Sequence, residues 1–275
     1  MKKDIRVIAL DLDGTLFNSQ KEVSQHTKDV LAECSRRGII VMPATGRPAT
    51  GFPHVLEAVP SFRYALTSNG ALVYDFAEKK GIYEDTISVE NALKVVEFTR
   101  KYDVMCDAYI GGYGYSEKDK LANIANYFQT QKMIDYVLST RIPVDDMGKF
   151  IRENGVGVEK LVCFFGDLSL QDKLAEDLAQ FDFLKITRAL VNNVELNNAT
   201  CNKGESLLQF AAHMGFTREQ TMACGDGNND LDMIRAAGFG VAMDNAAPEV
   251  KEAADYITLS NDDDGVAAVI EKYVL

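Results

Sequence analysis

The stretch Val7-Ile8-Ala9-Leu10-Asp11-Leu12-Asp13-Gly14-Thr15-Leu16 decides which fold and which chemistry we expect of this chain. It begins as a short apolar strand and delivers two carboxylates, Asp11 and Asp13, into a Gly-Thr turn. Residues i and i+2 of an extended chain share a side, so the two acids should converge on one small volume. Two charged carboxylates at such a short separation repel each other, unless a cation lies between them or one keeps its proton. The stretch therefore indicates a metal site or a nucleophile with an acid/base partner; the alternative is a plain turn that Asp11 begins as an Asx residue.

The composition is that of an ordinary globular protein. With 275 residues, 47% of them hydrophobic, the chain can bury one large core or two moderate ones. A net charge of −12 and the lack of a dense Lys/Arg run argue against nucleic acid and anionic membranes as partners. No apolar run approaches a membrane span of roughly 18 residues, so we expect a cytoplasmic protein. The five cysteines contain no CxxC pair, and we expect them to be small buried hydrophobic residues.

Strands and helices alternate at both ends of the chain. After the opening strand, the pattern predicts a helix over 23–37, a strand over 39–44, a helix from Pro48 towards residue 56, and a hairpin-like excursion over 63–74. Near the C-terminal end, strands are predicted over 194–196, 221–224, 240–243 and 256–259. Helices are predicted over 202–215, 231–237, 248–254 and 266–273. This alternation predicts an α/β fold with a doubly wound, mostly parallel sheet and ligands beyond the carboxyl ends of its strands.

The middle of the chain has a different pattern. Helices are predicted over 89–102, 118–128 and 168–181, and strands over 160–165 and 183–190. We therefore predict an inserted α+β domain over 84–190 and a core domain formed by 1–83 and 191–275. The patch Gly111-Gly112-Tyr113-Gly114 is expected to be a hairpin or a disordered turn, and Asp262-Asp263-Asp264 to be cap and dipole residues of the last helix rather than a metal cluster.

A second group of acids follows a predicted strand in the C-terminal part. In Gly225-Asp226-Gly227-Asn228-Asn229-Asp230, two carboxylates lie at a strand-to-helix junction, as Asp11 and Asp13 do. If the two strands are neighbours, three or four acids face one cleft. Magnesium prefers oxygen ligands and is commonly held by one or two carboxylates and a substrate phosphate, so we expect a magnesium site. A flexible loop with a helix-capping Asp230 is the alternative.

Two further places favour an anion. Thr45 and Gly46 are predicted to lie where a strand meets a helix N-terminus, whose free N–H groups and dipole attract negative charge. Lys203 lies in the first turn of a predicted helix, where it opposes the dipole unless an anion is bound there. Taken singly, Thr45 fits a cap and Lys203 a solvated surface charge. Taken together, they provide the phosphate-binding groups that the acidic residues do not.

Four signatures in this order resemble motifs one to four of the haloacid dehalogenase (HAD) superfamily. They are Asp11-Leu12-Asp13-Gly14-Thr15, Thr45-Gly46-Arg47, Lys203-Gly204 and Gly225-Asp226-Gly227-Asn228-Asn229-Asp230. The long insertion between the second and third resembles the Cof-type branch of small-metabolite phosphatases, in which the insertion is a mobile α/β cap of type IIB. Residues 197–202 lack the Pro-Gly-Val-Ser that often precedes the lysine in that branch.

The resemblance implies a HAD-like Rossmannoid core and a magnesium-dependent phosphatase of small phosphorylated metabolites, with sugar phosphates as the expected substrates. It implies that Asp11 attacks phosphorus to form an aspartyl-phosphate, while Asp13 acts first as an acid and then as a base. Thr45 and Lys203 would hold the transferring phosphoryl oxygens.

The resemblance also implies a metal and a substrate site. Asp11, the backbone carbonyl of Asp13 and Asp226 would bind Mg²⁺, with Asp230 bound directly or close by. The phosphate and substrate contacts would come from Thr45, Gly46, Arg47, Lys203 and Asn229.

Two other functions remain open. A phosphosugar mutase would share the aspartyl-phosphate, and a non-catalytic phosphometabolite-binding regulator would bind without turnover. A P-loop enzyme is excluded because no GxxxxGK[ST] surrounds Lys203, and a Rossmann dinucleotide site is disfavoured because Asp230 stands where the third glycine belongs. A small phosphate ester is the expected partner, and the sequence does not indicate an oligomeric state.

Overall fold

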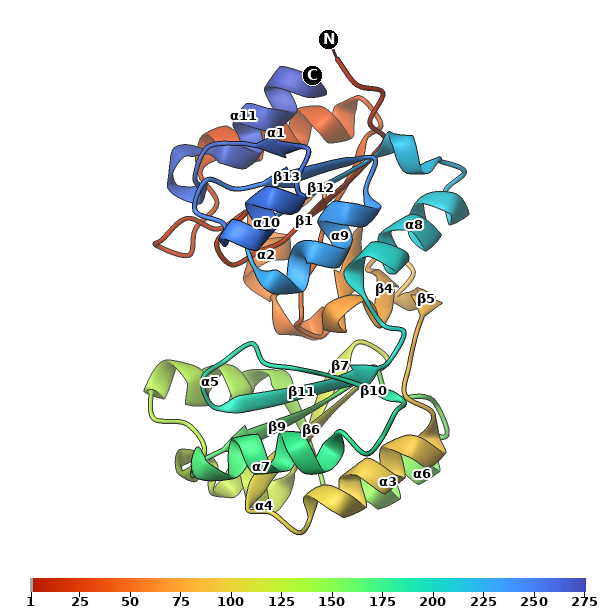
Figure 1. Ribbon diagram of the computed structural model, residues 1–275, viewed down its shortest axis with the longest axis vertical. Coiled ribbons are helices and arrows are strands. Elements are labelled where there is room, and N and C mark those ends of the chain that lie inside the picture. Colours follow the sequence, from red (N-terminus) through yellow and green to blue (C-terminus); the bar gives the residue numbers. More distant parts are fainter. Residues whose placement is uncertain (1) are drawn as a thin grey trace. The chain divides into compact units, whose positions relative to one another are not determined.

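The computed structural model describes residues 2–275, apart from the side chains of Pro53, His54 and Leu56. The chain forms two compact units, which Figure 1 shows coloured along the sequence. Unit 1 consists of the chain up to Arg47, of Phe52–Tyr83 and of Asn202–Leu275, and unit 2 consists of Pro48–Gly51 and Glu84–Cys201. The two ends of the chain thus fold together, and the middle folds separately.

Unit 1 is built on a five-stranded sheet in which all neighbours are parallel. The strand order is β14-β13-β12-β1-β2. The strands are β1 (Val7–Leu10), β2 (Ile40–Pro43), β12 (Thr221–Gly225), β13 (Phe239–Ala242) and β14 (Tyr256–Ile257). In the register of the sheet, Val7 of β1 lies opposite Thr221 of β12 and Ile40 of β2. The segments that follow β1, β2 and β12 therefore emerge at the same edge of the sheet.

Helices cover both faces of this sheet because β1 is apolar on both sides. The helices of unit 1 are α1 (Gln25–Arg36), α2 (Pro53–Ala58), α8 (Lys203–His213), α9 (Leu231–Ala236), α10 (Pro248–Ala253) and α11 (Gly265–Tyr273). Val7 and Ala9 are buried with side chains of α8 and α9, whereas Ile8 and Leu10 are buried with side chains of α1 and α11. The predicted doubly wound α/β fold is confirmed.

The predicted hairpin is also present. It joins β3 (Tyr64–Thr67) to β4 (Leu72–Asp75) in an antiparallel pair, and β5 (Lys80–Glu84) completes a three-stranded sheet. The turn between β3 and β4 holds Ser68, Asn69 and Gly70 at positive φ. A parallel bridge between Ala44 and Leu66 sets β3 beside the end of β2.

The prediction of one helix from Pro48 towards residue 56 is wrong. Ala49–Gly51 instead forms a 3₁₀ turn that belongs to unit 2, and α2 begins only after it. The reason is that unit 2 binds this turn: the Thr50 amide donates to the Gly112 carbonyl at 3.0 Å, and the Tyr136 hydroxyl donates to the Gly51 carbonyl at 3.2 Å.

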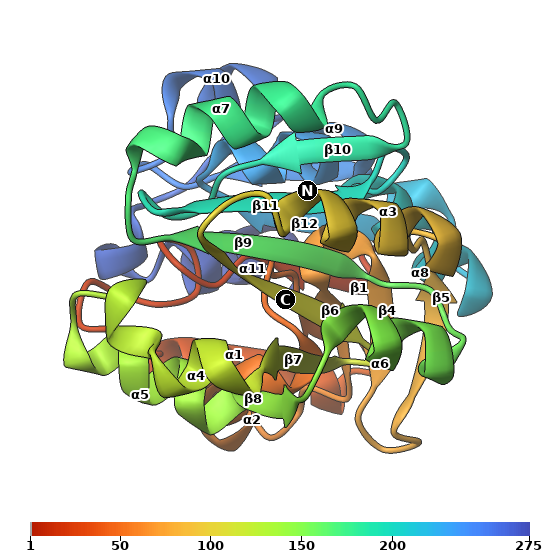
Figure 2. The same cartoon turned by 90° about the horizontal axis from the view of Figure 1, so that it is seen from below.

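Unit 2 has its own six-stranded sheet, in the order β10-β11-β9-β6-β7-β8. Its strands are β6 (Val104–Ile110), β7 (Tyr113–Glu117), β8 (Arg141–Val144), β9 (Lys160–Phe165), β10 (Leu184–Thr187) and β11 (Asn193–Asn198). Its helices are α3 (Val89–Thr99), α4 (Lys118–Ala122), α5 (Gln131–Thr140), α6 (Met147–Asn154) and α7 (Ser169–Leu178). Side chains of α3, α6 and α7 pack on one face of the sheet, and side chains of α5 pack on the other. Figure 2 labels these helices around the strands of unit 2.

The second boundary of the insertion lies later than predicted. We predicted that the chain returns to the core at residue 191, but β11 pairs with β9 and β10 in the sheet of unit 2. The reason is the alternation of this strand, because Val194 and Leu196 are both buried in the apolar cluster of unit 2. The sequence pattern also missed β6, β7 and β8. The glycine patch forms the hairpin turn between β6 and β7, with Gly111 and Gly112 at positive φ.

Two of the three aspartates before the last helix, Asp262 and Asp264, bond to the segment 19–27 instead of capping α11. Asp264 occupies the N-cap position of α11 without a side-chain cap bond. Its carboxylate accepts hydrogen bonds from the hydroxyls of Ser24 and Thr27 at the start of α1, and Asp262 accepts from the Ser19 amide at 2.7 Å. The expected role as cap residues is therefore wrong for the side chain of Asp264.

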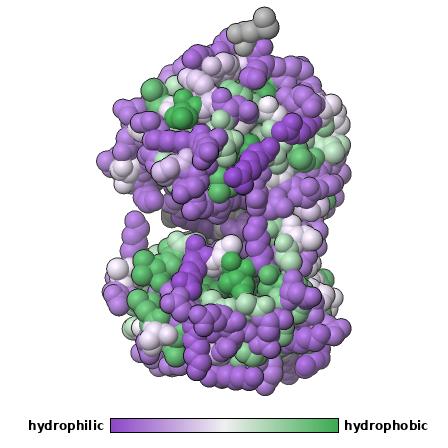
Figure 3. Space-filling model, viewed as in Figure 1, coloured by the Kyte–Doolittle hydropathy of each residue, from purple (hydrophilic) through white to green (hydrophobic). Residues whose placement is uncertain are grey.

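Most of the surface seen in Figure 3 is hydrophilic, in keeping with a chain in which 25% of the residues are charged. Among the helices formed by residues 2–275, none has both the length and the apolar character needed to cross a membrane. The cytoplasmic location stays a prediction from the sequence.

Candidate active site

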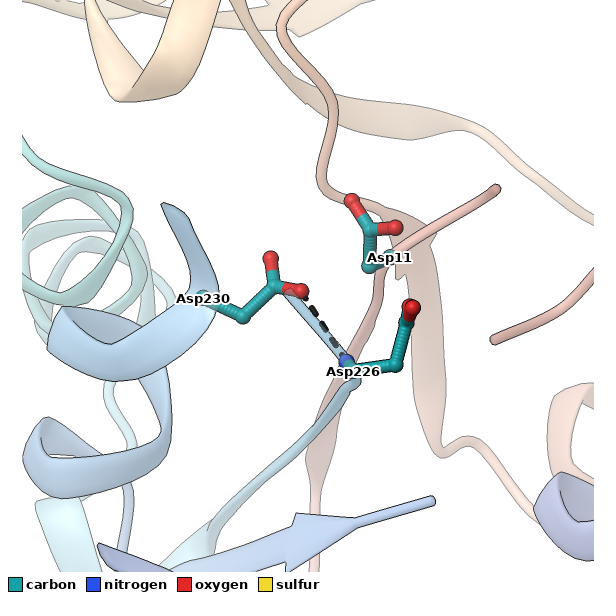
Figure 4. Close-up of side chains that lie close together, drawn as sticks. All are labelled: Asp11, Asp226 and Asp230. Carbon is teal, nitrogen blue, oxygen red and sulfur yellow. Dashed lines mark hydrogen bonds between the residues drawn. The ribbon is translucent and has the colours of Figure 1, made fainter. Parts of the chain in front are cut away.

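Three carboxylates come together at the carboxyl edge of the unit 1 sheet. Asp11 follows β1, and Asp226 and Asp230 follow β12, the strand beside it. One oxygen from each of the three lies within 4.8 Å of the others. Figure 4 shows the three side chains converging from these two segments. Asp230 is fully buried, Asp11 is 8% exposed, and Asp226 is half-buried.

Lys203 binds two of these carboxylates. It is the first residue of α8, a helix that the Asn202 side chain caps by accepting from the Glu205 amide. Its ammonium donates to Asp11 Oδ1 and to Asp230 Oδ1, both at 2.7 Å, and the side chain is only 1% exposed. Lys203 is therefore a buried cation inside the acidic cluster and not a solvated surface charge.

The cluster carries more negative than positive charge. Burial and the charge of Asp230 raise the pKa of Asp11 to about 8, although Lys203 opposes this shift. Burial also raises the pKa of Asp226, against the hydrogen bond that it accepts from Thr15. For Lys203, burial opposes the charged form, but Asp11 and Asp230 hold its pKa above the usual value. The three carboxylates share only one ammonium, so they suit a further hard cation that prefers oxygen ligands.

Backbone geometry fixes these side chains. Asp230 Oδ2 accepts from the amides of Asp226 and Gly227, each at 3.1 Å, and the first of these bonds is the dashed line of Figure 4. Thr15 Oγ1 donates to Asp226 Oδ1 at 2.8 Å. Gly14 has φ +88°, and a Cβ there would lie 2.3 Å from Asp226 Oδ2. Glycine is therefore required at residue 14, because any side chain would displace Asp226.

Asp13 lies apart from the three converging carboxylates. Its Oδ2 accepts from Arg47 Nη2 and its Oδ1 from Lys21 Nζ, both at 2.8 Å, and its side chain is 44% exposed. Although partial burial opposes it, the guanidinium and the ammonium hold the pKa of Asp13 below its usual range. Asp13 is thus an accessible carboxylate that two cations orient.

Thr45 and Gly46 do not lie at a helix N-terminus. No helix begins there, because the 3₁₀ turn starts only at Ala49. The argument from a helix dipole therefore fails for this pair. Thr45 is nevertheless buried, its hydroxyl accepts from the Arg47 amide at 3.2 Å, and its carbonyl accepts from the Asn69 amide at 3.1 Å. The turn between β3 and β4 holds Thr45 in place.

The remaining residues divide into expected and unexpected ones. Asn229 lies in a short 3₁₀ turn and is exposed. Lys21 was not a predicted site residue, because Asn18 indicates a turn but nothing in the sequence indicates that Lys21 takes φ +65° there and reaches Asp13. Thr15 is part of the first motif, whereas Asn245, whose side-chain amide donates to the Gly14 carbonyl at 2.8 Å, was not a predicted site residue.

Comparisons with known proteins place the chain in a family. The model of the haloacid dehalogenase-like hydrolase family matches residues 8–270, so the chain belongs to this family. The 5-amino-6-(5-phospho-D-ribitylamino)uracil phosphatase YcsE of Bacillus subtilis (strain 168) is 30% identical over 276 residues, covering 99% of this chain and 97% of that protein. A haloacid dehalogenase-like hydrolase from Bacteroides thetaiotaomicron has a similar solved structure, with a TM-score of 0.82, 31% identity, and coverage of 98% of this chain and 99% of that one.

A further solved structure shares the fold including the insertion. It is BT4131, described as a HAD subclass IIB sugar phosphatase, with a TM-score of 0.75, 23% identity, and coverage of 97% of this chain and 98% of that one. The family that the four motifs resemble is thus confirmed. The enzyme class is confirmed as well by the family model and by YcsE: the chain is a phosphatase of the haloacid dehalogenase superfamily.

Proposed function

We propose that this phosphatase is magnesium-dependent and hydrolyses sugar phosphates and related small phosphorylated metabolites through an aspartyl-phosphate. The observation that carries the proposal is the cluster of Asp11, Asp226 and Asp230, with oxygens within 4.8 Å of one another and Lys203 between two of them. A small divalent ion that prefers carboxylate oxygens, such as Mg²⁺, suits this set of three acids.

The magnesium ligands in this proposal are Asp11, Asp226 and the backbone carbonyl of Asp13, with Asp230 as a direct or neighbouring carboxylate. Asp230 is held by two backbone amides and by Lys203, which suits a residue that orients the cluster. When bound, the metal supplies positive charge that neutralises phosphate oxygens and lets the ester approach a carboxylate.

The chain's own side chains carry the reaction steps. Asp11 attacks the phosphorus atom in line, and Asp13, which must first take up a proton against the charges of Arg47 and Lys21, gives that proton to the leaving alkoxide. Asp13 then takes a proton from the water that hydrolyses the aspartyl-phosphate. Lys203 and Thr45 hold the transferring phosphoryl oxygens, where negative charge must be stabilised.

Two side chains and the backbone of a third residue complete the substrate contacts in this proposal. Arg47 and Asn229 would reach the bound ester, together with the Gly46 backbone. Arg47 donates to Asp13 at 2.8 Å, so it lies beside the acid that would protonate the leaving group. Asn229 is exposed at the end of the loop that carries Asp226, which leaves its amide available to a phosphate.

The name of a similar phosphatase supports this substrate class. YcsE is named for a ribitylamino compound that carries its phosphate on a polyol chain. We propose that this chain likewise takes a phosphate ester of a small polyhydroxylated molecule. The test is release of inorganic phosphate from a panel of sugar, sugar-alcohol and nucleoside monophosphates in the presence of Mg²⁺.

Removal of the metal is expected to stop turnover. After treatment with EDTA, phosphate release from the best substrate should fall to background and return on addition of excess Mg²⁺. Because the ion binds only the folded protein, Mg²⁺ at a hundred times its Kd should also stabilise the EDTA-treated protein by about 2.7 kcal/mol, measured by urea unfolding. The variant Asp226→Asn is the control: it should lose this stabilisation while the contacts of Lys203 remain. Full activity in EDTA would contradict the proposal.

Replacement of Asp13 is expected to affect substrates according to their leaving groups. In Asp13→Asn, hydrolysis of an alkyl phosphate should slow by about 10²–10⁴-fold, because the alkoxide no longer receives a proton. The first step with p-nitrophenyl phosphate should change much less, since nitrophenolate leaves without acid help, and phosphoenzyme should accumulate. Both rates are measured by phosphate or nitrophenolate release. Unchanged hydrolysis of the alkyl phosphate would remove Asp13 from this role.

A further inference from the structure

Two cysteines face one another across the middle of the unit 2 sheet. Strands β6 and β9 are antiparallel neighbours, and Cys106 lies directly opposite Cys163 in their register. Both side chains belong to the face that packs against α3, α6 and α7, because both contact the same apolar cluster. Both are free thiols. The fold therefore brings together two of the five cysteines, although they are 57 positions apart in the sequence.

The hydrogen-bond pattern places this pair at the closer kind of cross-strand position. The Phe165 amide donates to the Asn192 carbonyl at 2.9 Å, so Phe165 is bonded towards β11. The backbone N–H and C=O groups of successive residues in a strand point to alternate sides. Those of Cys163, two residues before Phe165, therefore also point towards β11 and away from β6. Opposite residues without mutual backbone bonds have Cα atoms about 4.5 Å apart. Disulfides span Cα distances of about 4.4–6.8 Å, so the backbone already satisfies this requirement.

The two thiols differ in access. Cys163 is fully buried, whereas Cys106 is half-buried and lines a cavity of about 130 Å³ together with Tyr102, Glu117 and Lys120. The hydrogen bond with Cys106, together with burial, holds the pKa of Cys163 well above the usual range of a thiol. A reagent from solvent therefore reaches Cys106 first, and Cys163 is the neighbour that can react next.

We propose that Cys106 and Cys163 form a redox-active pair that closes reversibly to a cross-strand disulfide on exposure to a small-molecule disulfide such as oxidised glutathione. In the first step the Cys106 thiolate attacks a sulfur of the reagent, which forms a mixed disulfide and releases one glutathione. In the second step Cys163 loses its proton and attacks the Cys106 sulfur, which releases the second glutathione. Two protein thiols are oxidised, one reagent disulfide is reduced to two thiols, and the two protons end on the released glutathiones.

The test uses the full-length protein under native conditions. Wild-type protein, Cys106→Ser and Cys163→Ser are incubated with oxidised glutathione, then denatured in the presence of N-ethylmaleimide and analysed by intact mass and peptide mapping. Wild-type protein should lose two alkylatable thiols of its five, leaving three, with a peptide that links residues 106 and 163. Dithiothreitol should restore all five. The Cys163→Ser variant should instead retain one glutathione on Cys106, and Cys106→Ser should form neither adduct nor link.

Three outcomes would overturn the proposal. They are a stable glutathione adduct on wild-type Cys106 without the 106–163 link, a link between other cysteines, and five alkylatable thiols after prolonged oxidation. Because Cys163 is buried, circular dichroism must first show that Cys163→Ser is folded; Cys163→Ala is the second variant if it is not. The outcome does not depend on the proposed phosphatase mechanism, since the readout is covalent and no substrate is involved.

Discussion

Asp11→Asn is expected to lower phosphate release by at least about 10³-fold, because an amide cannot form the aspartyl-phosphate on which the proposed reaction depends. The fold should persist. Asp11 lies beside a second acid, and after its replacement Lys203 keeps its 2.7 Å contact with Asp230. Burial and Asp230 already disfavour the charged carboxylate of Asp11, so loss of that charge should cost little stability. Activity is measured with p-nitrophenyl phosphate and with the best metabolite, and folding by circular dichroism.

The matched control for this variant is Asp29→Asn. Asp29 is an exposed aspartate on α1 whose carboxylate accepts a hydrogen bond from the Gln25 side chain at 2.8 Å. This change removes the same charge from unit 1 and should leave the rate of phosphate release unchanged. If Asp11→Asn kept a rate within tenfold of wild type, the nucleophile would have to be another residue, and the proposed covalent mechanism would be wrong.

The convergence of the acids was predictable because it follows from the rules of parallel sheets. Asp11 and Asp226 each come directly after a buried strand, and strands of alternating βα units end at the same edge. Lys203 was predictable for a different reason, since a lysine at a helix start is unfavourable without an anion nearby. In the structure the anions beside Lys203 are Asp11 and Asp230. From the sequence we expected these acids close to the phosphate site, but not in direct contact with the lysine.

The rest of the site depends on contacts with no local signature. Lys21 reaches Asp13 from a turn that the Asn18 side chain closes by accepting from the amides of Gln20 and Glu22, but the positive φ of Lys21 in that turn has no signal in its residue type. Thr45 follows a strand as predicted, but the segment after it binds to unit 2, so the expected helix N-terminus does not form. The late domain boundary has the same cause. The alternation of apolar and polar residues in β11 (Asn193–Asn198) would suit a strand in the sheet of either unit. Only its pairing with β9 assigns it to unit 2.

Lys203→Met is expected to cause the largest loss of stability, together with loss of activity. The change removes a buried ammonium and leaves Asp11 and Asp230, both more than 90% buried, without the cation that they share. Removing one partner of a buried ion pair typically costs about 3–5 kcal/mol. The free energy of unfolding, measured in urea with EDTA present at pH 8, should fall by that amount relative to wild type. Lys149→Met is the control, since Lys149 is 71% exposed and its 3.8 Å pair with Glu153 lies on the surface.

The dependence of this loss on pH separates an electrostatic cause from a packing defect. Asp11 has a folded-state pKa of about 8 even with Lys203 present, far above the 3.8 expected of the unfolded chain. A group whose pKa is raised on folding favours the folded state below its unfolded pKa and loses that contribution as the pH rises through its folded pKa. Without Lys203 the folded-state pKa of Asp11 lies further above 8, so the contribution of Asp11 differs between the variant and wild type only from about pH 8 upwards. Lys203→Met should therefore lose more stability at pH 10 than at pH 6, and the double variant Lys203→Met/Asp230→Asn should recover part of it. A deficit of equal size at both pH values would mean that Lys203 stabilises unit 1 by packing and not by its charge.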